Sequence, residues 1–244
     1  MPPFNRCSMN VQLSFRCTVA TVALIGAKLA DVQTTLSRQV AQAHRTEGLL
    51  YLQLERWPQA MACYQKAIPA FRAAQDWLGL GQTCCQLATL MLQRYDYTSA
   101  RRWANLAVHS FTKASLTPHP PTEVQTHHAA ALHLLGQANF CEGHYALAVK
   151  QLEQALSIRH RLGDEVGEAL VLVDLGQVYQ AQSQYWYALA CYEGALDMAQ
   201  SKSAVFEGRW FEVKVRRKMA KLCRLCGHGD LAMKHHLEAL ALGQ

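Results

Sequence analysis

The sequence predicts an all-α solenoid of antiparallel helix pairs, and three observations lead to this prediction. The pattern Ala-x-x-x-(apolar or aromatic)-x-x-Ala occurs four times, and each copy follows a small residue by twelve positions. Successive copies lie about forty residues apart, which is a period of helical repeat arrays. Half of the residues are apolar, and no window shows the sustained alternation of a β-strand. The four copies are Ala60/Tyr64/Ala67, Ala100/Ala104/Ala107, Ala148/Leu152/Ala155 and Ala188/Tyr192/Ala195, after Gly48, Ala88, Gly136 and Gly176 respectively.

The spacing of this pattern has a physical reason. Small residues at matching points of two antiparallel helices let the backbones approach closely, and the large residue one turn later fills the space beside them. Each helix pair leaves one apolar face exposed, so several pairs must stack before any of them is stable. An array of this kind presents an extended surface that can hold another molecule.

The first forty residues are expected to form an N-terminal capping helix or a degenerate repeat. Ala20, Leu24 and Ala27 stand forty positions before the second helix of the first good repeat, and terminal units of solenoids are atypical. The apolar run 17–27 could also be the apolar part of a signal peptide. It is too short to cross a bilayer as a helix, which takes about 20 apolar residues. We favour the capping helix, and the signal segment stays open.

The array is expected to occupy residues 41–244. Four good repeats begin near residues 41, 81, 129 and 169, and a degenerate fifth begins near 213. The second and third repeats are 48 residues apart instead of 40, and the extra length coincides with a proline-rich stretch that we expect to be a loop at residues 115–126. Such a loop could let the two halves of the array flex.

Several copies resemble tetratricopeptide repeats. That family carries Leu-Gly-x-x-Tyr in the first helix and Ala-x-x-x-Phe/Tyr-x-x-Ala in the second. The fourth copy fits best, with Leu175, Gly176 and Tyr179 followed by Ala188, Tyr192 and Ala195. The family's tryptophan and its closing proline are absent, and the unit exceeds the usual ~34 residues. The longer unit resembles the subfamily of kinesin light chains, cell-polarity scaffolds and the sensory arms of bacterial regulators.

This resemblance implies a right-handed superhelical array that acts as a non-catalytic scaffold or adaptor for a protein or peptide partner. In the family, the first helices line a concave groove, and amides on successive turns suit an extended peptide. Carried onto this chain, the groove residues are Arg45, Leu49, Gln86, Thr89, Gln93, His133, Gln137, Asp174, Gln177, Gln180, Lys214, Arg217, Lys218 and Lys221.

The fifth unit adds a cluster of positive charge. Six basic residues fall between Lys214 and Arg224 with no acid among them. Such a stripe would attract an acidic segment, a carboxyl terminus or a phosphate. The plainer interpretation, a solvated charged cap, is equally open. The lysine and asparagine clamp of chaperone-binding relatives is missing, and we expect Asp174 to repel a carboxylate.

Other functional classes are disfavoured. No phosphate loop, nucleophile elbow or zinc-protease helix occurs, so we expect no enzyme and no cofactor. Cys223, Cys226 and His228, with His235 and His236, could enclose zinc, but the repeat places Cys223 on a buried helix face, so we expect no metal. The net charge of +6 allows a nucleic-acid-binding repeat, yet the basic stripe lacks interleaved aromatic residues, so we expect no nucleic acid.

The cysteines indicate a reducing compartment, so we expect a cytoplasmic protein without a transmembrane segment. A peptide-sensing regulatory module and a complex-assembly factor remain alternatives to the adaptor. The sequence identifies neither the partner nor the oligomeric state.

Overall fold

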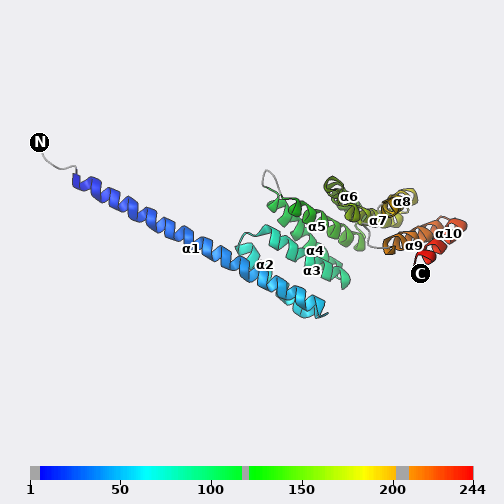
Figure 1. Cartoon of the computed structure of the whole chain (residues 1–244), viewed down its shortest axis with the longest axis horizontal. Coiled ribbons are helices and arrows are strands. Elements are labelled where there is room, and N and C mark those ends of the chain that lie inside the picture. The colour runs from blue at the N-terminus through cyan, green and yellow to red at the C-terminus, as the bar shows by residue number, and fades with distance from the viewer. Residues whose placement is uncertain (1–5, 117–120, 202–208, 244) are drawn as a thin grey trace. The chain divides into compact units, whose positions relative to one another are not determined.

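The protein is helical wherever regular structure is described. The computed structural model describes residues 6–116, 121–201 and 209–243, with side chains from Gly26 onward. Its helices in chain order are α1 (Arg6–Gln53), α2 (Trp57–Ala73), α3 (Trp77–Gln93), α4 (Tyr97–Ala114), α5 (Thr122–Cys141), α6 (Tyr145–Leu162), α7 (Glu165–Ala181), α8 (Tyr185–Ser201), α9 (Trp210–Leu225) and α10 (Gly229–Leu242) (Figure 1).

These helices pack as the predicted pairs. The end of α1 pairs with α2, α5 with α6, α7 with α8 and α9 with α10, and successive pairs meet through α4 with α5, α6 with α7 and α8 with α9. The chain divides into two compact units, Met1–Leu80 and Gly81–Gln244, whose boundary falls within α3. The prediction of an all-α solenoid of helix pairs is therefore confirmed.

The small residue of each repeat lies against the large one, as its spacing requires. A Cβ atom added to Gly48 would lie 2.6 Å from the Tyr64 ring, and one added to Gly176 would lie 2.5 Å from the Tyr192 ring. Both rings are completely buried. Because a real Cβ atom cannot approach a fixed ring so closely, glycine sets the distance between the two helices of a repeat.

The turns between helices share one backbone device. Seven of the described turns contain one residue with positive φ. This left-handed conformation ends a helix and lets its last carbonyl groups accept hydrogen bonds from the turn. These residues are Glu55, Gln75, Tyr95, Gly143, Gly163, Ser183 and Gly227. Aspartate caps the following helix in three places: the carboxylates of Asp76, Asp96 and Asp164 accept hydrogen bonds from the backbone N–H groups of Gly79, Ser99 and Gly167.

The first helices begin earlier than the sequence suggested. Helices α3, α7 and α9 start about four residues before the expected repeat starts of 81, 169 and 213. Helix α5 begins at Thr122, directly after Pro121, so residues 122–126 of the expected loop 115–126 are helical. Proline fixes the extended backbone before a helix and lacks only an N–H that has no helical partner there. Residues 117–120 of the expected loop lie outside the described residues.

Helix α1 passes through the expected boundary near residue 40 without a turn. It forms one helix of 48 residues, so the anticipated N-terminal unit and the first helix of the first repeat are continuous. Ala41 is fully buried, whereas every described side chain from Gly26 to Val40 is at least partly exposed. Ala20, Leu24 and Ala27 thus lie within a helix. The division of the chain at residue 40 stays a prediction.

Candidate functional site

The first helices of the third, fourth and fifth repeats are joined by a row of polar side chains. On α7, Asp174 accepts hydrogen bonds from Gln137 Nε2 at 2.6 Å and from Gln177 Nε2 at 2.7 Å. His133 Nε2 lies 2.7 Å from Asp174 Oδ2. Lys218 Nζ of α9 donates to Gln177 Oε1 at 2.8 Å. We call these five residues the polar row.

The row follows from the repeat geometry. His133 and Asp174 are 41 positions apart in sequence, and so are Gln177 and Lys218. The third and fourth repeats begin 40 residues apart, so the first pair joins nearly equivalent points of two successive first helices. The fourth and fifth begin 44 residues apart, so the second pair joins points shifted by three residues, which is almost one helical turn. The structure thus brings together five of the predicted groove residues: His133, Gln137, Asp174, Gln177 and Lys218.

Asp174 is the centre of the row, and its charge is compensated on several sides. Burial tends to raise the pKa of this carboxyl, but the His133 hydrogen bond and charge, the Gln137 hydrogen bond and the Lys214 charge outweigh burial and lower it. Asp174 is therefore ionised at neutral pH and already satisfied by its neighbours. The expectation that Asp174 would repel a carboxylate is weakened for this reason.

Positive charge collects beside the row on α9. Burial lowers the pKa of Lys218, and the charges of Lys214 and Lys221 lower it further while Asp174 raises it. Lys214, Arg217 and Lys221 are exposed. Lys218 therefore lies in a region where positive charge exceeds negative charge, which is the condition under which an anion is attracted.

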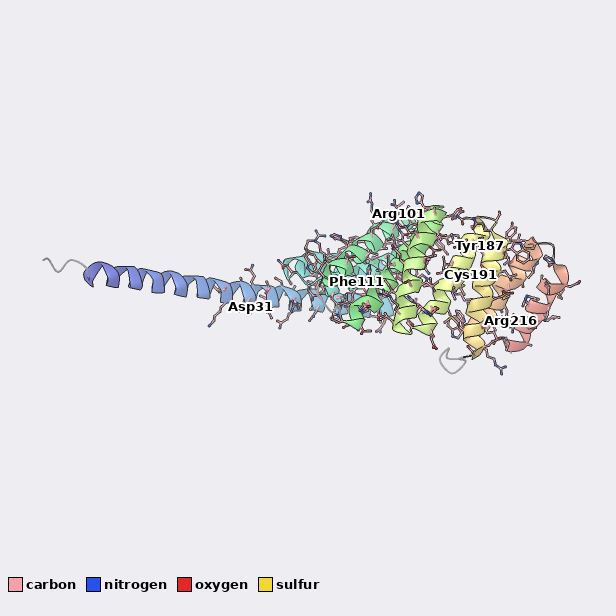
Figure 2. The ribbon with its side chains drawn as sticks, turned by 90° about the horizontal axis from the view of Figure 1, so that it is seen from above. Asp31, Arg101, Phe111, Tyr187, Cys191 and Arg216 are labelled. Carbon is pink, nitrogen blue, oxygen red and sulfur yellow. The ribbon has the colours of Figure 1, made fainter. Side chains whose placement is uncertain are left out.

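One member of the basic cluster is occupied elsewhere. Arg216 of α9 (Figure 2) donates through Nε to Glu212 at 2.9 Å and forms an ion pair with Glu238 of α10. Its side chain holds the last helix pair together, so it does not contribute to the exposed stripe.

Arg159 of α6 is a site residue that the sequence analysis missed. It lies against Gly167 just as Phe71 lies against Gly79 in the first unit, with the same separation of eight positions. Arg159 Nη2 is 3.5 Å from His133 Nδ1, and Nη1 is 3.6 Å from Asp164 Oδ2. The guanidinium therefore supports the buried side of His133. The sequence contained one signal that could have identified Arg159: this position holds a charged residue, whereas the matching position of another repeat holds Phe71.

A cavity of about 310 Å³ lies next to the polar row. Gln137, Asp174 and Gln177 form its polar part. Its other lining side chains are apolar or aromatic and come from α3, the turn after it, α4, α5, α6 and α7: Leu92, Tyr95, Tyr97, Phe140, Cys141, Leu152 and Val178. The arrangement can accept a small apolar group beside hydrogen-bonding amides.

The remaining predicted groove residues have separate surroundings. In the first unit, the Arg45 guanidinium lies 5.8 Å from the centre of the Phe71 ring, and Leu49 is 37% exposed. On α3, Gln86 is half-buried, Thr89 donates to the Cys85 carbonyl and Gln93 is exposed. Gln180 accepts a hydrogen bond from the Tyr192 hydroxyl at 3.2 Å, which ties it to the repeat core.

The cysteine and histidine cluster near the C-terminus is dispersed. Cys223 is buried in α9, where burial raises the pKa of its thiol, and Cys226 is exposed. Within the described ranges, no three histidine, cysteine or acidic side chains gather closely enough to hold a metal ion. No helix in this part of the chain combines the length and apolar character needed to span a bilayer.

Comparison with known proteins agrees with the geometry. The tetratricopeptide repeat family matches residues 127–201. No curated protein sequence matches the chain significantly. Among solved structures, the apo form of RapI is 13% identical with a TM-score of 0.72, over 83% of this chain and 69% of RapI.

Two further solved structures show the same fold. Aspartyl phosphate phosphatase F from Bacillus subtilis is 14% identical with a TM-score of 0.69, over 91% of this chain and 54% of that protein. The TPR-like repeats of a kinesin light chain from Podosopora anserina are 15% identical with a TM-score of 0.65, over 82% of this chain and 93% of that one. The family match covers residues 127–201, and with the repeat packing described above, the solved structures show that the chain shares the fold of tetratricopeptide-repeat arrays.

Proposed function

We propose that this protein is a non-catalytic interaction scaffold that binds an extended, acidic segment of a partner protein along its first helices. The segment would lie across α5, α7 and α9, with its acidic end at Lys214, Arg217, Lys218 and Lys221. The tetratricopeptide-repeat fold supports a protein partner, because such arrays present one continuous surface built from successive repeats.

The observation that carries this proposal is the link from Asp174 through Gln177 to Lys218. Asp174 already has three polar contacts, from His133, Gln137 and Gln177, and these stabilise its charge within the protein. Lys218 donates to a neutral acceptor, Gln177; burial and the charges of Lys214 and Lys221 lower its pKa, whereas the charge of Asp174 raises it. A carboxylate placed beside Lys218 would relieve this repulsion and form charge-assisted hydrogen bonds.

The surrounding groups favour a peptide over a compact ligand. Gln137 and Gln177 are amides on successive first helices, and each amide can both donate to and accept from a peptide backbone. The cavity of about 310 Å³ beside them could take one apolar side chain of the same segment. We expect an affinity in the micromolar range or weaker, since a few polar contacts must offset the ordering of the peptide.

A peptide selection tests this proposal. A displayed library of random peptides is selected against the full chain, and an enriched peptide is labelled with fluorescein for polarisation measurements. We expect enrichment of aspartate and glutamate, and binding that weakens by about tenfold or more when NaCl rises from about 50 to about 500 mM. The double variant Lys218→Glu/Lys221→Glu should lose about tenfold or more in affinity.

A matched control separates local from general charge effects. Lys66→Glu/Lys150→Glu makes the same change in net charge at exposed positions on second helices. We expect this variant to bind within about twofold of the unchanged protein. Selected peptides without acidic residues, or equal losses in both double variants, would contradict the proposal.

A peptide-sensing regulatory module is the second candidate, because the long repeat unit resembles that of the sensory arms of bacterial regulators. In that role the array would change conformation on binding, with the proline-rich stretch as its hinge. Residues 117–120 of that stretch lie outside the described residues. Small-angle scattering with and without the selected peptide distinguishes the two: a scaffold keeps its radius of gyration, and a closing sensor reduces it. A nucleic-acid role is less favoured, and an electrophoretic shift at submicromolar protein would be needed to support it.

A further inference from the structure

The middle of α1 carries an apolar stripe that no other described side chain of its own unit covers. Leu29, Val32 and Leu36 are 65%, 64% and 58% exposed, although all three are large apolar residues on one helix. Helix α2, the other complete helix of the unit, has 17 residues against the 48 of α1. At 1.5 Å per residue, α2 can cover only about a third of α1. Figure 2 shows Asp31 on the part of α1 that α2 does not reach.

A long helix with an exposed apolar stripe needs a partner. Isolated helices gain little stability from their own hydrogen bonds, and most helical stability in proteins comes from packing of an apolar face. From Gly26 to Val40, two residues, Thr34 and Ser37, are partly covered and all the others are exposed. The stripe therefore has no packing partner among the described residues of its unit.

The spacing of the stripe identifies the kind of partner. Val22, Ile25, Leu29, Val32 and Leu36 follow one another at alternating intervals of three and four residues. This heptad spacing is the signature of helices that pack side by side in a coiled coil. In heptad notation, Val22, Leu29 and Leu36 occupy a positions, and Ile25 and Val32 occupy d positions.

We propose that α1 binds the α1 helices of other copies of this chain, so that the protein assembles through an N-terminal coiled coil. The flanking e and g positions from residue 26 to 42 contain one charged residue, Lys28. This near absence of charge is compatible with pairing between identical helices. Partner choice between different coiled-coil chains is normally encoded in charges at these positions. A nearly neutral flank brings no repulsion between identical helices.

The same residues indicate the number of strands. Leucine at a with isoleucine at d shifts the preference from two strands to three or four. Five buried apolar side chains at about 60–120 Å² each would bury roughly 600–1,200 Å² in a pair of helices, at or below the lower end of stable interfaces. In a four-stranded bundle, each stripe contacts two neighbours, which increases the buried area. We therefore expect a tetramer.

A membrane surface fits the stripe less well. Helices that lie in a membrane interface carry many lysine and arginine residues on their polar side. Residues 26–40 contain Lys28 and Arg38 as their basic residues, and Arg38 Nε lies 3.4 Å from Asp76 Oδ2. The other polar residues of this stretch are mostly glutamine, threonine and serine.

The mass of the full chain in solution tests the proposal. Light scattering after gel filtration at about 50 μM protein should give about four times the 27.3 kDa of one chain. The variant Leu29→Glu/Leu36→Glu places charges in the stripe and should be monomeric. Its matched control, Ala27→Glu/Ala30→Glu, adds the same charges at exposed f and b positions outside the stripe and should keep the unchanged mass.

Two results would overturn the inference. One is a monomeric unchanged protein at this concentration, whether or not it binds anionic vesicles. The other is an assembly whose mass the two double variants affect equally, since that assembly would use a different surface. Circular dichroism at 222 nm checks that the variants keep the folded array. Any assembly that the stripe variant alone reduces to monomers supports the coiled coil. Both results are independent of whether acidic peptides bind to α9.

Discussion

The contact between Gly176 and Tyr192 offers a direct test of how the repeats pack. A Cβ atom at Gly176 would lie 2.5 Å from Cε1 and 2.8 Å from Cδ1 of the Tyr192 ring. The ring is completely buried and rigid, so it cannot swing aside as a flexible chain end would. Overpacking of this kind costs about 1–3 kcal/mol. Alanine in a helix interior recovers roughly 0.5–1 kcal/mol relative to glycine. Gly176→Ala should therefore destabilise the fold by up to about 2.5 kcal/mol, as the difference between these two effects.

A double-mutant cycle isolates the energy of the contact between residues 176 and 192. Tyr192→Ala removes the ring and should cost about 3–5 kcal/mol on its own. In that background the new Cβ atom at residue 176 has room, so Gly176→Ala should now stabilise by about 0.5–1 kcal/mol. The double variant places alanine at both positions, as the second repeat does with Ala88 and Ala104. The expected coupling is about 1–3 kcal/mol.

Urea unfolding followed by circular dichroism at 222 nm measures these free energies. Gly194→Ala in α8 is the control, because a Cβ atom there would meet only Leu172 Cδ1 at 3.6 Å, an ordinary contact. This control should stabilise by roughly 0.5–1 kcal/mol. The packing argument is refuted if Gly176→Ala stabilises as much as the control does, or if the two changes at 176 and 192 add within about 0.5 kcal/mol.

Three further predictions follow from the described contacts. Because the pKa of Asp174 is lowered on folding, its carboxylate stabilises the fold above its unfolded pKa near 3.8, and this stabilisation is lost as pH falls through the lower folded value. Asp174→Asn should accordingly flatten the melting temperature between about pH 5 and pH 2, and a profile as steep as that of the unchanged protein would contradict this. Asp96→Ala removes the cap on Ser99 N–H and should cost about 0.5–2 kcal/mol in urea unfolding, whereas Asp96→Asn should cost less. Burial raises the pKa of Cys85 to about 12 and that of Cys191 to about 11, so a thiol reagent near pH 8 should label exposed Cys226 first and these two only after unfolding, as mass spectrometry of the labelled peptides would show.

The repeat packing could be predicted from sequence because it depends on local spacing. The small residue and the residue that faces it are sixteen positions apart in each good repeat, as with Gly136 and Leu152. This interval runs from a point within the first helix, around the short turn, to the facing point of the second helix, so the pattern indicates both helices and the contact between them. The predicted helix pairs were confirmed for that reason.

The connections were less predictable from sequence. An in-phase pattern such as Ala20, Leu24 and Ala27 indicates helix but carries no information on where a helix stops. The positive-φ residues that end helices include Glu55, Gln75 and Tyr95, and nothing in these residue types signals such a turn as glycine does. Helix α1 consequently continued through the expected boundary near residue 40.

The candidate site could be predicted as a set of positions but not as a network. The resemblance named His133, Asp174 and Lys218, because each occupies a first helix. His133 meets Asp174, and Gln177 meets Lys218, at an offset of 41 residues between neighbouring first helices. This offset follows from the angle between successive repeats in space. The role of Arg159 was missed, because a buried arginine in a second helix is recognisable only when its partners His133 and Asp164 are seen around it.

Photo-cross-linking of a selected acidic peptide tests the proposed binding surface most directly. The peptide carries one diazirine group, is bound to the full chain near its dissociation constant, and the cross-linked residues are found by mass spectrometry. We predict cross-links on α5, α7 and α9, concentrated between Lys214 and Lys221 when the reactive group stands next to the acidic residues. Cross-links concentrated on α6, α8 and α10 would contradict the proposal that partners bind along the first helices.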